Sequence, residues 1–331
     1  MIEIEFPLAP LNEQRRVAAK LERLLSRVDA AQARLANVPR ILKRFRQSVL
    51  AAACSGRLTA DWREQNPNLE SAESYLRKNN VDAALLENSE IPARWVCCRL
   101  ENLSELITKG ASPKWQGISY STRGVLFVTS ENVGSGRLLL DTKKFVEPKF
   151  NELQKRSILR SGDLLTNIVG ASIGRSAIYE LQELANINQA VALIRLREFV
   201  EKQYVLNVLN SPAVIDHMHD EKVDVARANI SLKDVANFPI PLPALAEQQE
   251  IVRRVEALFK TADALEARYR KAKAHVDKLT QSILAKAFRG ELVPQDPNDE
   301  PASVLLDRIK KGDKEDNSRK TGRQKRRRVT N

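Results

Sequence analysis

The chain has 331 residues, of which 43% are hydrophobic and 29% charged, so it can hold one or two domains together with extended elements. No run of 18 apolar residues occurs, and the first residues lack the basic start and apolar core of a signal peptide. We therefore predict a cytoplasmic protein that has no membrane partner. The three cysteines lack metal-ligand spacing, which favours a reducing compartment and predicts no metal site.

The net charge of +12 suggests a polyanionic partner, but the charge is unevenly distributed. Residues 310–331 carry ten basic and three acidic side chains, and residues 13–56 carry the same numbers. Residues 92–236 hold 19 basic and 16 acidic side chains and are nearly neutral. A basic tail is typical of a solvated, disordered segment, whereas an ordered basic helix could lie along phosphates or against an acidic protein.

The first predicted element is a long helix at about 13–56. Its hydrophobic residues alternate in steps of three and four, which is the spacing of a coiled-coil seam, so this stripe must be buried against another long helix. Pro39 interrupts the run, and we expect a kink there or two collinear helices. The run ends at Gly56, because glycine most easily takes the left-handed conformation. The predicted seam consists of Leu21, Leu24, Val28, Leu35, Leu42, Phe45 and Val49.

An acidic loop and a small helix at about 70–78 are predicted to follow. From 92 to 237 the pattern changes to short β-prone runs, such as 124–129 and 190–195, broken by Gly, Ser and Asn. A helix is plausible at 202–209. A stretch of this length predicts a compact mixed α/β domain with its own core.

A second long helix is predicted at about 247–289, ending at Gly290, and then a small helix at about 300–311. Residues 312–331 are predicted to form a disordered basic tail. The seam of the second long helix consists of Val255, Leu258, Leu265, Tyr269, Val276, Leu279 and Ile283.

The two long helices are copies of one element. Residues 7–58 match residues 241–292 at a constant offset of 234, with 18 identities in 52 positions and no gap. Two copies are too few for a solenoid. We predict an α+β fold in which two long helices form an antiparallel coiled coil and flank one compact mixed α/β domain. The alternative is that they are two ordinary amphipathic helices of a bundle.

The middle domain carries several short motifs in a fixed order between the two copies. They are Trp95 with Leu100, Thr108–Pro113, Val128–Val133, Ser161–Leu165, Gly170–Arg175, Asn188–Gln189, Asn229–Ser231 and Pro239–Pro243, which leads into Glu247–Gln248. Through these motifs nearly the whole chain resembles the specificity (S) subunit of Type I restriction-modification systems. It resembles an N-terminally short form with one target-recognition domain, since the chain starts where a first recognition domain should just have ended.

This resemblance implies a domain organisation. Subunits of this family alternate recognition domains with a repeated helical region, so that two recognition domains sit at opposite ends of an antiparallel coiled coil. By analogy, the first conserved helical region spans 1–91, the target-recognition domain 92–237 and the second helical region 238–311. The missing recognition domain could be supplied by another polypeptide or by a second copy of this chain, or it could be lost.

The same resemblance implies the function of a DNA sequence-recognition subunit. Such a chain would bind double-stranded DNA, read one half of a bipartite target, and scaffold a modification methyltransferase subunit and a restriction motor-nuclease subunit. S-adenosylmethionine, ATP and Mg²⁺ would be held by those partners, and this chain would need no cofactor of its own.

Base recognition requires side chains that donate or accept hydrogen bonds in fixed geometry, and only a few such contacts specify sequence. We expect these side chains in the loops of the middle domain, first of all at 109–115 and 129–132. The candidates are Lys109, Ser112, Lys114, Trp115, Thr129, Ser130, Asn132, Asn167, Ser172, Arg175, Asn188, Gln189, Arg227 and Asn229.

Structural roles compete with some of these assignments. Gly162–Asp163 favours a tight turn before a strand, and Asn188–Gln189 could equally cap or bridge strands. Trp95 is predicted to be in the core, whereas Trp115 could either stack on a base or pack. His217 and His219 lack partners at metal-ligand spacing and favour structural or surface roles.

No catalytic residues are predicted. The chain has no phosphate-binding Gly-x-x-x-x-Gly-Lys-Ser/Thr loop and no Asn/Asp-Pro-Pro-aromatic segment of an adenine methyltransferase. Asp141 with Glu147 and Lys149 superficially matches a nuclease triad, but Pro148 sits where such a strand needs a hydrogen-bond donor. Two other functions stay open: a coiled-coil scaffold whose middle domain binds protein, and a non-assembling remnant of a split specificity gene.

Overall fold

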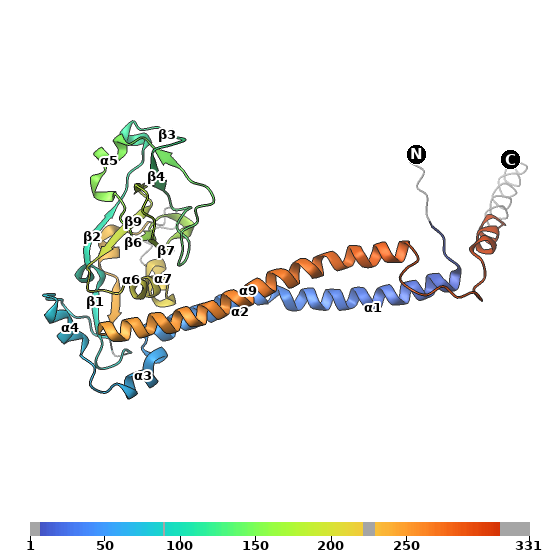
Figure 1. Cartoon of the computed structure of the whole chain (residues 1–331), viewed down its shortest axis with the longest axis horizontal. Helices are drawn as coiled ribbons and strands as arrows, with labels where there is room; N and C mark the ends of the chain where they lie inside the picture. The colour runs from blue at the N-terminus through green and yellow to red at the C-terminus, as the bar shows by residue number, and fades with distance from the viewer. Residues whose placement is uncertain (1–6, 89, 221–228, 312–331) are drawn as a thin grey trace, which may run out of the picture. The chain divides into compact units, whose positions relative to one another are not determined.

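The computed structural model describes residues 7–88, 90–220 and 229–311 (Figure 1). The chain separates into two compact units. The helical unit contains the described residues 7–41 and 264–311, and the mixed unit contains residues 42–263. Within the described ranges, no helix is long and apolar enough to cross a membrane.

The repeated sequence forms three long helices instead of two. The first copy forms α1 (Leu11–Ala36) and α2 (Val38–Cys54), and the second copy forms one unbroken helix, α9 (Leu245–Phe288). The break between α1 and α2 lies at Asn37, two residues before Pro39, where the sequence predicts an interruption. Pro39 instead occupies the first turn of α2, where a missing backbone N–H costs nothing. Of the two outcomes expected near Pro39, a kink or two helices, the first copy forms two helices.

Glycines end both copies as predicted. Gly56 follows α2 with φ 73° and Gly290 follows α9 with φ 74°, a left-handed conformation that a side chain would strain. After Gly56 the chain forms α3 (Ala60–Gln65) and α4 (Ala72–Lys78), and after Gly290 it forms a helix over 302–311.

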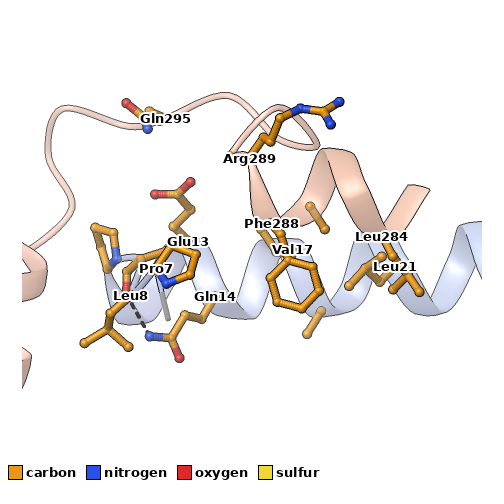
Figure 2. Close-up of a pocket in the computed structure, with 15 residues that line it drawn as sticks. Pro7, Leu8, Glu13, Gln14, Val17, Leu21, Leu284, Phe288, Arg289 and Gln295 are labelled. Atoms are coloured by element: carbon orange, nitrogen blue, oxygen red, sulfur yellow. Dashed lines mark hydrogen bonds between the residues drawn. The ribbon is translucent and has the colours of Figure 1, made fainter. Parts of the chain in front are cut away.

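In the helical unit, α1 packs against the C-terminal part of α9. Val17 lies beside Phe288, and Leu21 lies beside Leu284, so the two helices run antiparallel (Figure 2). The segment after Gly290 is attached to α1 by an ion pair, in which the Arg16 guanidinium donates two hydrogen bonds of 3.2 and 2.5 Å to the Asp299 carboxylate.

In the mixed unit, α2 and the N-terminal part of α9 also run antiparallel. Val49 and Val255 are buried seam residues, as predicted. Two other predicted seam residues are exposed, Phe45 in this unit (37%) and Leu265 in the helical unit (48%), and their assignment to the seam is wrong. Each follows a buried residue by three positions, and on a helix of 3.6 residues per turn a three-residue step ends at the margin of the stripe.

The side chain of Arg46 covers the seam where Phe45 was expected. Its guanidinium lies 5.3 Å from the centre of the Phe259 ring and forms an ion pair of 2.7 Å with Asp263. An arginine stem with a stacked guanidinium can cover apolar surface, so Phe45 is left on the outside of α2.

In the described residues 92–220 and 229–242, which hold the middle domain, the chain contains three small sheets and four short α-helices. The first sheet pairs β1 (Val96–Arg99) with β10 (Pro239–Leu242). The second has the antiparallel order β2 (Ser104–Lys109), β9 (Val191–Leu196), β6 (Asp163–Asn167) and β7 (Ser176–Tyr179). The third has the order β3 (Tyr120–Ser121), β5 (Phe145–Val146), β4 (Val125–Val128) and β8 (Ala185–Ile187). The helices are α5 (Lys149–Leu153), α6 (Lys202–Leu209), α7 (Pro212–Asp220) and α8 (Leu232–Ala236).

The second sheet is buried on both faces. Successive side chains of a strand point to opposite faces, and Leu165 of β6 packs in a cluster with Leu126 and Ile187 of the third sheet. Its neighbour Leu164 belongs instead to a cluster that includes Tyr204 of α6 and Val255 of α9. The sheet is therefore packed between the third sheet and the helices. The prediction of an α+β fold with a compact mixed domain is confirmed.

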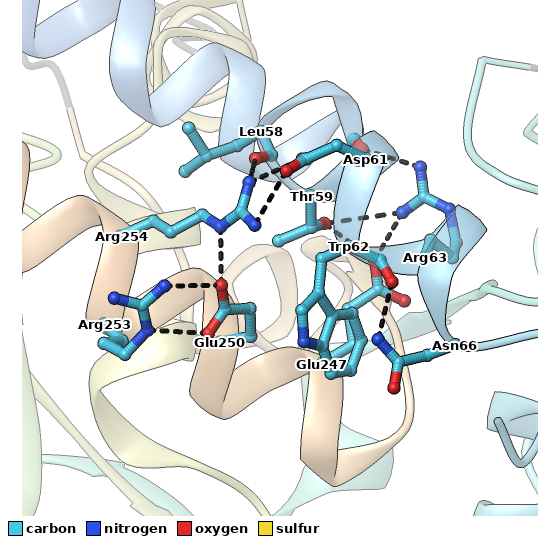
Figure 3. Close-up of polar contacts among 11 residues, drawn as sticks. Leu58, Thr59, Asp61, Trp62, Arg63, Asn66, Glu247, Glu250, Arg253 and Arg254 are labelled. Carbon is cyan, nitrogen blue, oxygen red and sulfur yellow. Dashed lines mark hydrogen bonds and ion pairs between the residues drawn. The ribbon is translucent and has the colours of Figure 1, made fainter.

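A buried carboxylate connects this domain to α9. Glu247 is 4% exposed and accepts hydrogen bonds from the indole N–H of Trp95 (2.8 Å) and the hydroxyl of Thr59 (2.7 Å). It also forms an ion pair with Arg63, whose other nitrogen donates to the Gly56 carbonyl (2.8 Å) (Figure 3). A buried carboxylate needs hydrogen-bond donors, and each donor to Glu247 comes from a part of the chain that is distant in sequence.

The next residue makes a second connection. The Gln248 side chain donates to the Pro243 carbonyl (2.8 Å) and accepts from the backbone N–H of Glu201 (3.1 Å). The Glu-Gln pair that opens the second copy of the repeat therefore holds the start of α6 and the N-terminal end of α9 together.

About two turns beyond Glu247 along α9, Arg254 reaches the loop that follows α2. It donates to the Leu58 carbonyl (2.8 Å), to both carboxylate oxygens of Asp61 (2.6 and 3.0 Å) and to Glu250 (2.6 Å) (Figure 3). Hydrogen bonds from Arg253, and then from Arg254, lower the pKa of Glu250 from 4.5 to about 2.

Substituting Glu247→Gln should lower the free energy of unfolding by about 3 kcal/mol, because the half-buried Arg63 loses its counter-charge. Urea denaturation followed by tryptophan fluorescence measures the change. The matched control is Glu73→Gln, since Glu73 pairs with Arg77 at an exposed site and should contribute less than about 1 kcal/mol. Equal losses for the two variants would contradict the role given to Glu247.

The lowered pKa of Glu250 predicts a pH dependence of stability. Because the folded-state pKa lies below the unfolded value, the stabilisation is complete above about pH 4.5 and is lost as the pH falls towards about 2. Between these values the stability difference between the native chain and a Glu250→Gln variant should shrink. Denaturant midpoints of both proteins across this window test the prediction, and a constant difference would refute it.

Candidate nucleic-acid interface

Strand ends bring most of the predicted DNA-contacting loops to one edge of the middle domain. In the second sheet, Lys109 at the end of β2 pairs with Ala192, and Asn167 at the end of β6 pairs with Val191. Arg175 directly precedes β7 at the same edge. We call residues 109–115, 129–138, 168–175, 188–190 and 229–231 the loop edge.

The third sheet contributes two of these loops. Strands β4 and β8 are parallel, with Val128 beside Ile187, so their carboxyl ends lie together. The Asn188 N–H donates to the Val128 carbonyl (3.1 Å). The segment 229–231 joins through Ile230, whose N–H donates to the Ile168 carbonyl (2.9 Å).

The loop at 109–115 is packed tightly against the end of β8. A Cβ atom on Gly110 would approach the Ile187 carbonyl oxygen to 1.7 Å, so only glycine fits there. Beyond it, a short turn over 114–116 presents Lys114 and Trp115 to solvent. Trp115 is 79% exposed, which decides between the two roles considered for it: its ring is available for stacking.

Three candidate residues are buried and support the loops from inside. Asn132 is 5% exposed and accepts from the backbone N–H and the hydroxyl of Thr129 (3.0 and 3.1 Å). Its amide nitrogen donates to the carbonyls of Leu139 (2.9 Å) and Thr142 (3.2 Å). Its hydrogen-bonding groups are therefore used within the domain.

The side-chain nitrogen of Asn167 has the same kind of role, whereas its buried side-chain oxygen has no hydrogen-bond partner among the described residues. Asn167 is fully buried, and its amide nitrogen donates to the Ser130 carbonyl (2.9 Å), which ties the end of β6 to the loop after β4. The expectation that Thr129, Asn132 and Asn167 contact bases is corrected: their side chains shape the loop edge.

The other described candidates lie at the surface of the loop edge. Lys109, Lys114, Trp115, Arg175, Gln189 and Asn229 are exposed, and Ser112, Ser130, Ser172 and Asn188 are partly exposed. The oxygen of the Asn188 side chain accepts a hydrogen bond from the Ala190 N–H (3.2 Å), so the amide nitrogen is its remaining hydrogen-bonding group. Arg227 lies outside the described residues.

The structure adds one cation that the sequence analysis missed. Arg137 ends the turn 134–137, in which the Gly136 N–H donates to the Ser176 carbonyl (2.8 Å), so this exposed arginine lies near Arg175. The available signal was the Gly-Ser-Gly-Arg run at 134–137, a glycine-rich turn that ends in a base-reading residue type.

Charge is concentrated at this edge although the whole domain is nearly neutral. Lys109, Lys114, Arg137 and Arg175 form no ion pair with any residue that the structure describes. Glu131, the acidic residue of the loop edge, is paired with Lys144 (2.7 Å), whose hydrogen bond lowers the pKa of Glu131. Such unpaired cations on one surface are what phosphates require.

Several other residues considered in the sequence analysis have structural roles in the domain. Asp163 follows Gly162, which has φ 95°, and accepts two hydrogen bonds of 2.7 Å from Arg195. Trp95 is buried, and the His217 ring packs edge-on against Phe238.

The chain is similar in sequence to known specificity subunits. Residues 92–274 match the family model of the Type I restriction modification DNA specificity domain. The chain is 37% identical to the EcoBI specificity subunit of Escherichia coli, over 92% of this chain and 63% of that subunit. It is 35% identical to the EcoKI specificity subunit of E. coli K12 (93% and 63%) and 30% identical to the E. coli EcoDI specificity subunit (93% and 68%).

Solved structures share the fold. One chain of a type I restriction-modification system, solved in a study of complex assembly and conformational transition, matches with a TM-score of 0.62 at 24% identity, covering 86% of this chain and 61% of that one. The HsdS subunit of Thermoanaerobacter tengcongensis matches with a TM-score of 0.51 at 24% identity, covering 86% and 60%. This chain thus spans about 63% of the length of the first two relatives. By its matched domain and its similarity to the three subunits, the chain belongs to the Type I restriction-modification DNA specificity family.

Proposed function

We propose that this chain recognises one half of a bipartite DNA target through the loop edge of its recognition domain. The observation that carries this proposal is the convergence of five loops, with four cations that have no described ion-pair partner, on one edge of a nearly neutral domain. A protein-binding scaffold with a neutral middle domain would not require this segregation of charge.

The side chains of the loop edge divide into two roles. Lys109 and Lys114 are point charges suited to phosphate contacts, which position the domain. Arg175, Arg137, Gln189 and Asn229 have the donor and acceptor geometry that reads guanine and adenine edges. Trp115 supplies an exposed ring that can contact sugar or an unstacked base.

The chemistry of the complex belongs to other chains. We propose that this chain scaffolds a modification methyltransferase subunit and a restriction motor-nuclease subunit, and that these hold S-adenosylmethionine, ATP and Mg²⁺. The exposed faces of the long helices and the small helices α4 and 302–311 are the proposed docking surfaces. In this proposal the helical regions are 1–91 and 238–311, and the recognition domain is 92–237. Co-purification with a methyltransferase subunit tests the scaffold role.

Substituting Lys109→Ala should weaken binding to all duplex sequences alike. Loss of one phosphate contact should reduce the slope of log K against log salt by about one. Fluorescence anisotropy with a random-sequence duplex at several salt concentrations measures both effects. The control is Arg156→Ala: Arg156 is exposed and precedes β6, on the side away from the loop edge. If both variants bound like the native chain, the loop edge would not be the DNA-binding surface.

Substituting Gln189→Ala should relax sequence preference at one base pair without changing the salt slope. A bidentate contact to adenine discriminates by about 1–3 kcal/mol, which corresponds to roughly 5- to 150-fold. Selection of bound duplexes from a randomised pool reports the preference at each position. Gln182→Ala is the matched control, since Gln182 is exposed before β8, at the other end of that strand. An unchanged selected motif would remove Gln189 from the interface.

A further inference from the structure

One side of the helical pair in the helical unit carries only positive charge. The positions of a coiled-coil heptad are lettered a to g, and the seam occupies a and d. Counted from Leu21 and Val276 at position a, the cations of this side fall at c and g. We call them the basic flank: Lys20, Arg23, Arg27 and Arg34 of α1, and Arg268, Lys271 and Lys278 of α9. Lys20 is partly exposed, and the other six are exposed.

The two helices present these positions on the same side of their seam. In an antiparallel pair the e positions of one helix face the e positions of the other, and the g positions face each other on the opposite side. In the helical unit Ala18 and Ala287, both at e positions, line the same pocket. In the mixed unit Arg46 stacks on Phe259, and these are again two e positions. The c and g positions of α1 and α9 therefore form one surface on the other side.

The acidic residues of this helical pair lie away from the basic flank. Residues 14–37 and 264–288 contain four carboxylates, all at b or e positions: Glu22, Asp29, Glu266 and Asp277. The cations at b and e positions are partly neutralised, since Arg270 pairs with Glu266 and Lys273 with Asp277, each at 2.6 Å. The cations of the basic flank form no ion pair with any residue that the structure describes.

This arrangement does not stabilise the helical pair itself. The antiparallel register that places Leu21 beside Leu284 also brings Lys278 of α9 level with Arg27 of α1 (Figure 2). Cations of the two helices therefore share one surface, and like charges on neighbouring helical positions are unfavourable. Because the stability of the pair gives no reason for this pattern, the pattern favours an anionic partner.

The residues between these cations favour nucleic acid over protein as that partner. The other c and g positions between Lys20 and Arg34, and from Arg268 to residue 285, hold only small or polar side chains: Ala30, His275, Ser282 and Ala285. A protein interface buries apolar and aromatic side chains at its centre and is depleted in lysine, whereas a phosphate backbone requires only cations. An exposed large apolar side chain, Leu265 (48%), lies beyond the end of the flank.

The length of the basic flank suits a short stretch of duplex. From Lys20 to Arg34 the helix rises about 21 Å at ~1.5 Å per residue, which is the length of about six base pairs. Seven cations stand along this length without an intervening acidic residue at c or g. The surface therefore offers a line of charges to a ligand that carries a regular line of opposite charges.

We propose that the basic flank is a second DNA-contacting surface of this chain, which binds the phosphate backbone of a duplex without reading its sequence. The inference rests on the proposed function for the choice of duplex DNA, and it adds a contact outside the loop edge. The lysine and arginine side chains donate hydrogen bonds to phosphate oxygens and release counterions from the duplex. The opposite side, which carries both signs of charge, stays available to the partner subunits.

The test compares two double variants of the full chain on a long random-sequence duplex, by fluorescence anisotropy at several salt concentrations. Arg27→Gln with Arg34→Gln should reduce the slope of log K against log salt by about two, because two phosphate contacts are lost. Arg15→Gln with Arg270→Gln is the matched control, since it removes the same charge from b positions and should leave the slope unchanged. The cations of 312–331 are present in every variant and contribute equally.

Folding of the flank variant is checked by circular dichroism and its thermal midpoint. The midpoint should equal or exceed that of the native chain, because the substitutions remove repulsion between like charges. Lysine acetylation, read by mass spectrometry with and without the duplex, reports contact directly. The duplex should slow acetylation of Lys271 and Lys278 severalfold and leave Lys273 unchanged, although Lys273 lies between them on the same helix.

Three outcomes would overturn the proposal: an unchanged salt slope in the flank variant, an equal loss of slope in the control, or acetylation of Lys271 that the duplex does not slow. A flank variant that binds DNA like the native chain but no longer co-purifies with a methyltransferase subunit would assign the flank to a protein instead. If Lys109→Ala reduces the slope and the flank variant does not, this inference alone is refuted. The reverse result refutes the proposed function alone.

Discussion

The fold of the mixed unit depends on the burial of one carboxylate. Glu247 is removed from water, which is unfavourable unless its oxygens are satisfied. The donors are Trp95 at the start of the recognition domain and Thr59 and Arg63 beyond α2. Because the absence of any of these groups leaves a charge poorly compensated, three segments distant in sequence must assemble together. The position of the recognition domain on its helices follows from this requirement.

Duplication of the helical element gives the chain two sites built on the same Glu-Gln start. One is closed by the recognition domain and by hydrogen bonds from Trp95, Glu201 and Arg63. The other keeps the hydrogen bond from the Gln14 side chain to the Ala9 carbonyl, but its apolar side chains line an open pocket. Similar local sequence thus produces different surfaces, because burial is decided by what lies against a helix and not by the helix itself.

The loop edge contains two kinds of residue: buried residues that hold its loops in place, and exposed residues that are available to contact DNA. The amide nitrogens of the buried residues Asn132 and Asn167 donate hydrogen bonds to neighbouring loops and hold those loops in place. The cations Lys109 and Arg175 extend from this support into solvent. A nearly neutral domain can therefore present a positive surface, since the loop edge carries four cations and a single acidic residue, Glu131, which is paired with Lys144. Recognition of a phosphate backbone depends on this local excess and not on net charge.

The amino-acid sequence by itself determined the features that depend on near neighbours. Helix periodicity, the break near Pro39 and the glycine ends depend on residues a few positions apart, and the repeat is seen by aligning two segments of the sequence directly. The α+β fold and its helical frame could therefore be predicted. The tertiary structure alone decided which side chains are exposed. The amide of Asn167 can be buried because the carbonyl of Ser130, 37 positions away, accepts its hydrogen bond, whereas Trp115 is 79% exposed on its turn. Exposure is a property of contacts between distant segments, and a local pattern carries no information about those contacts.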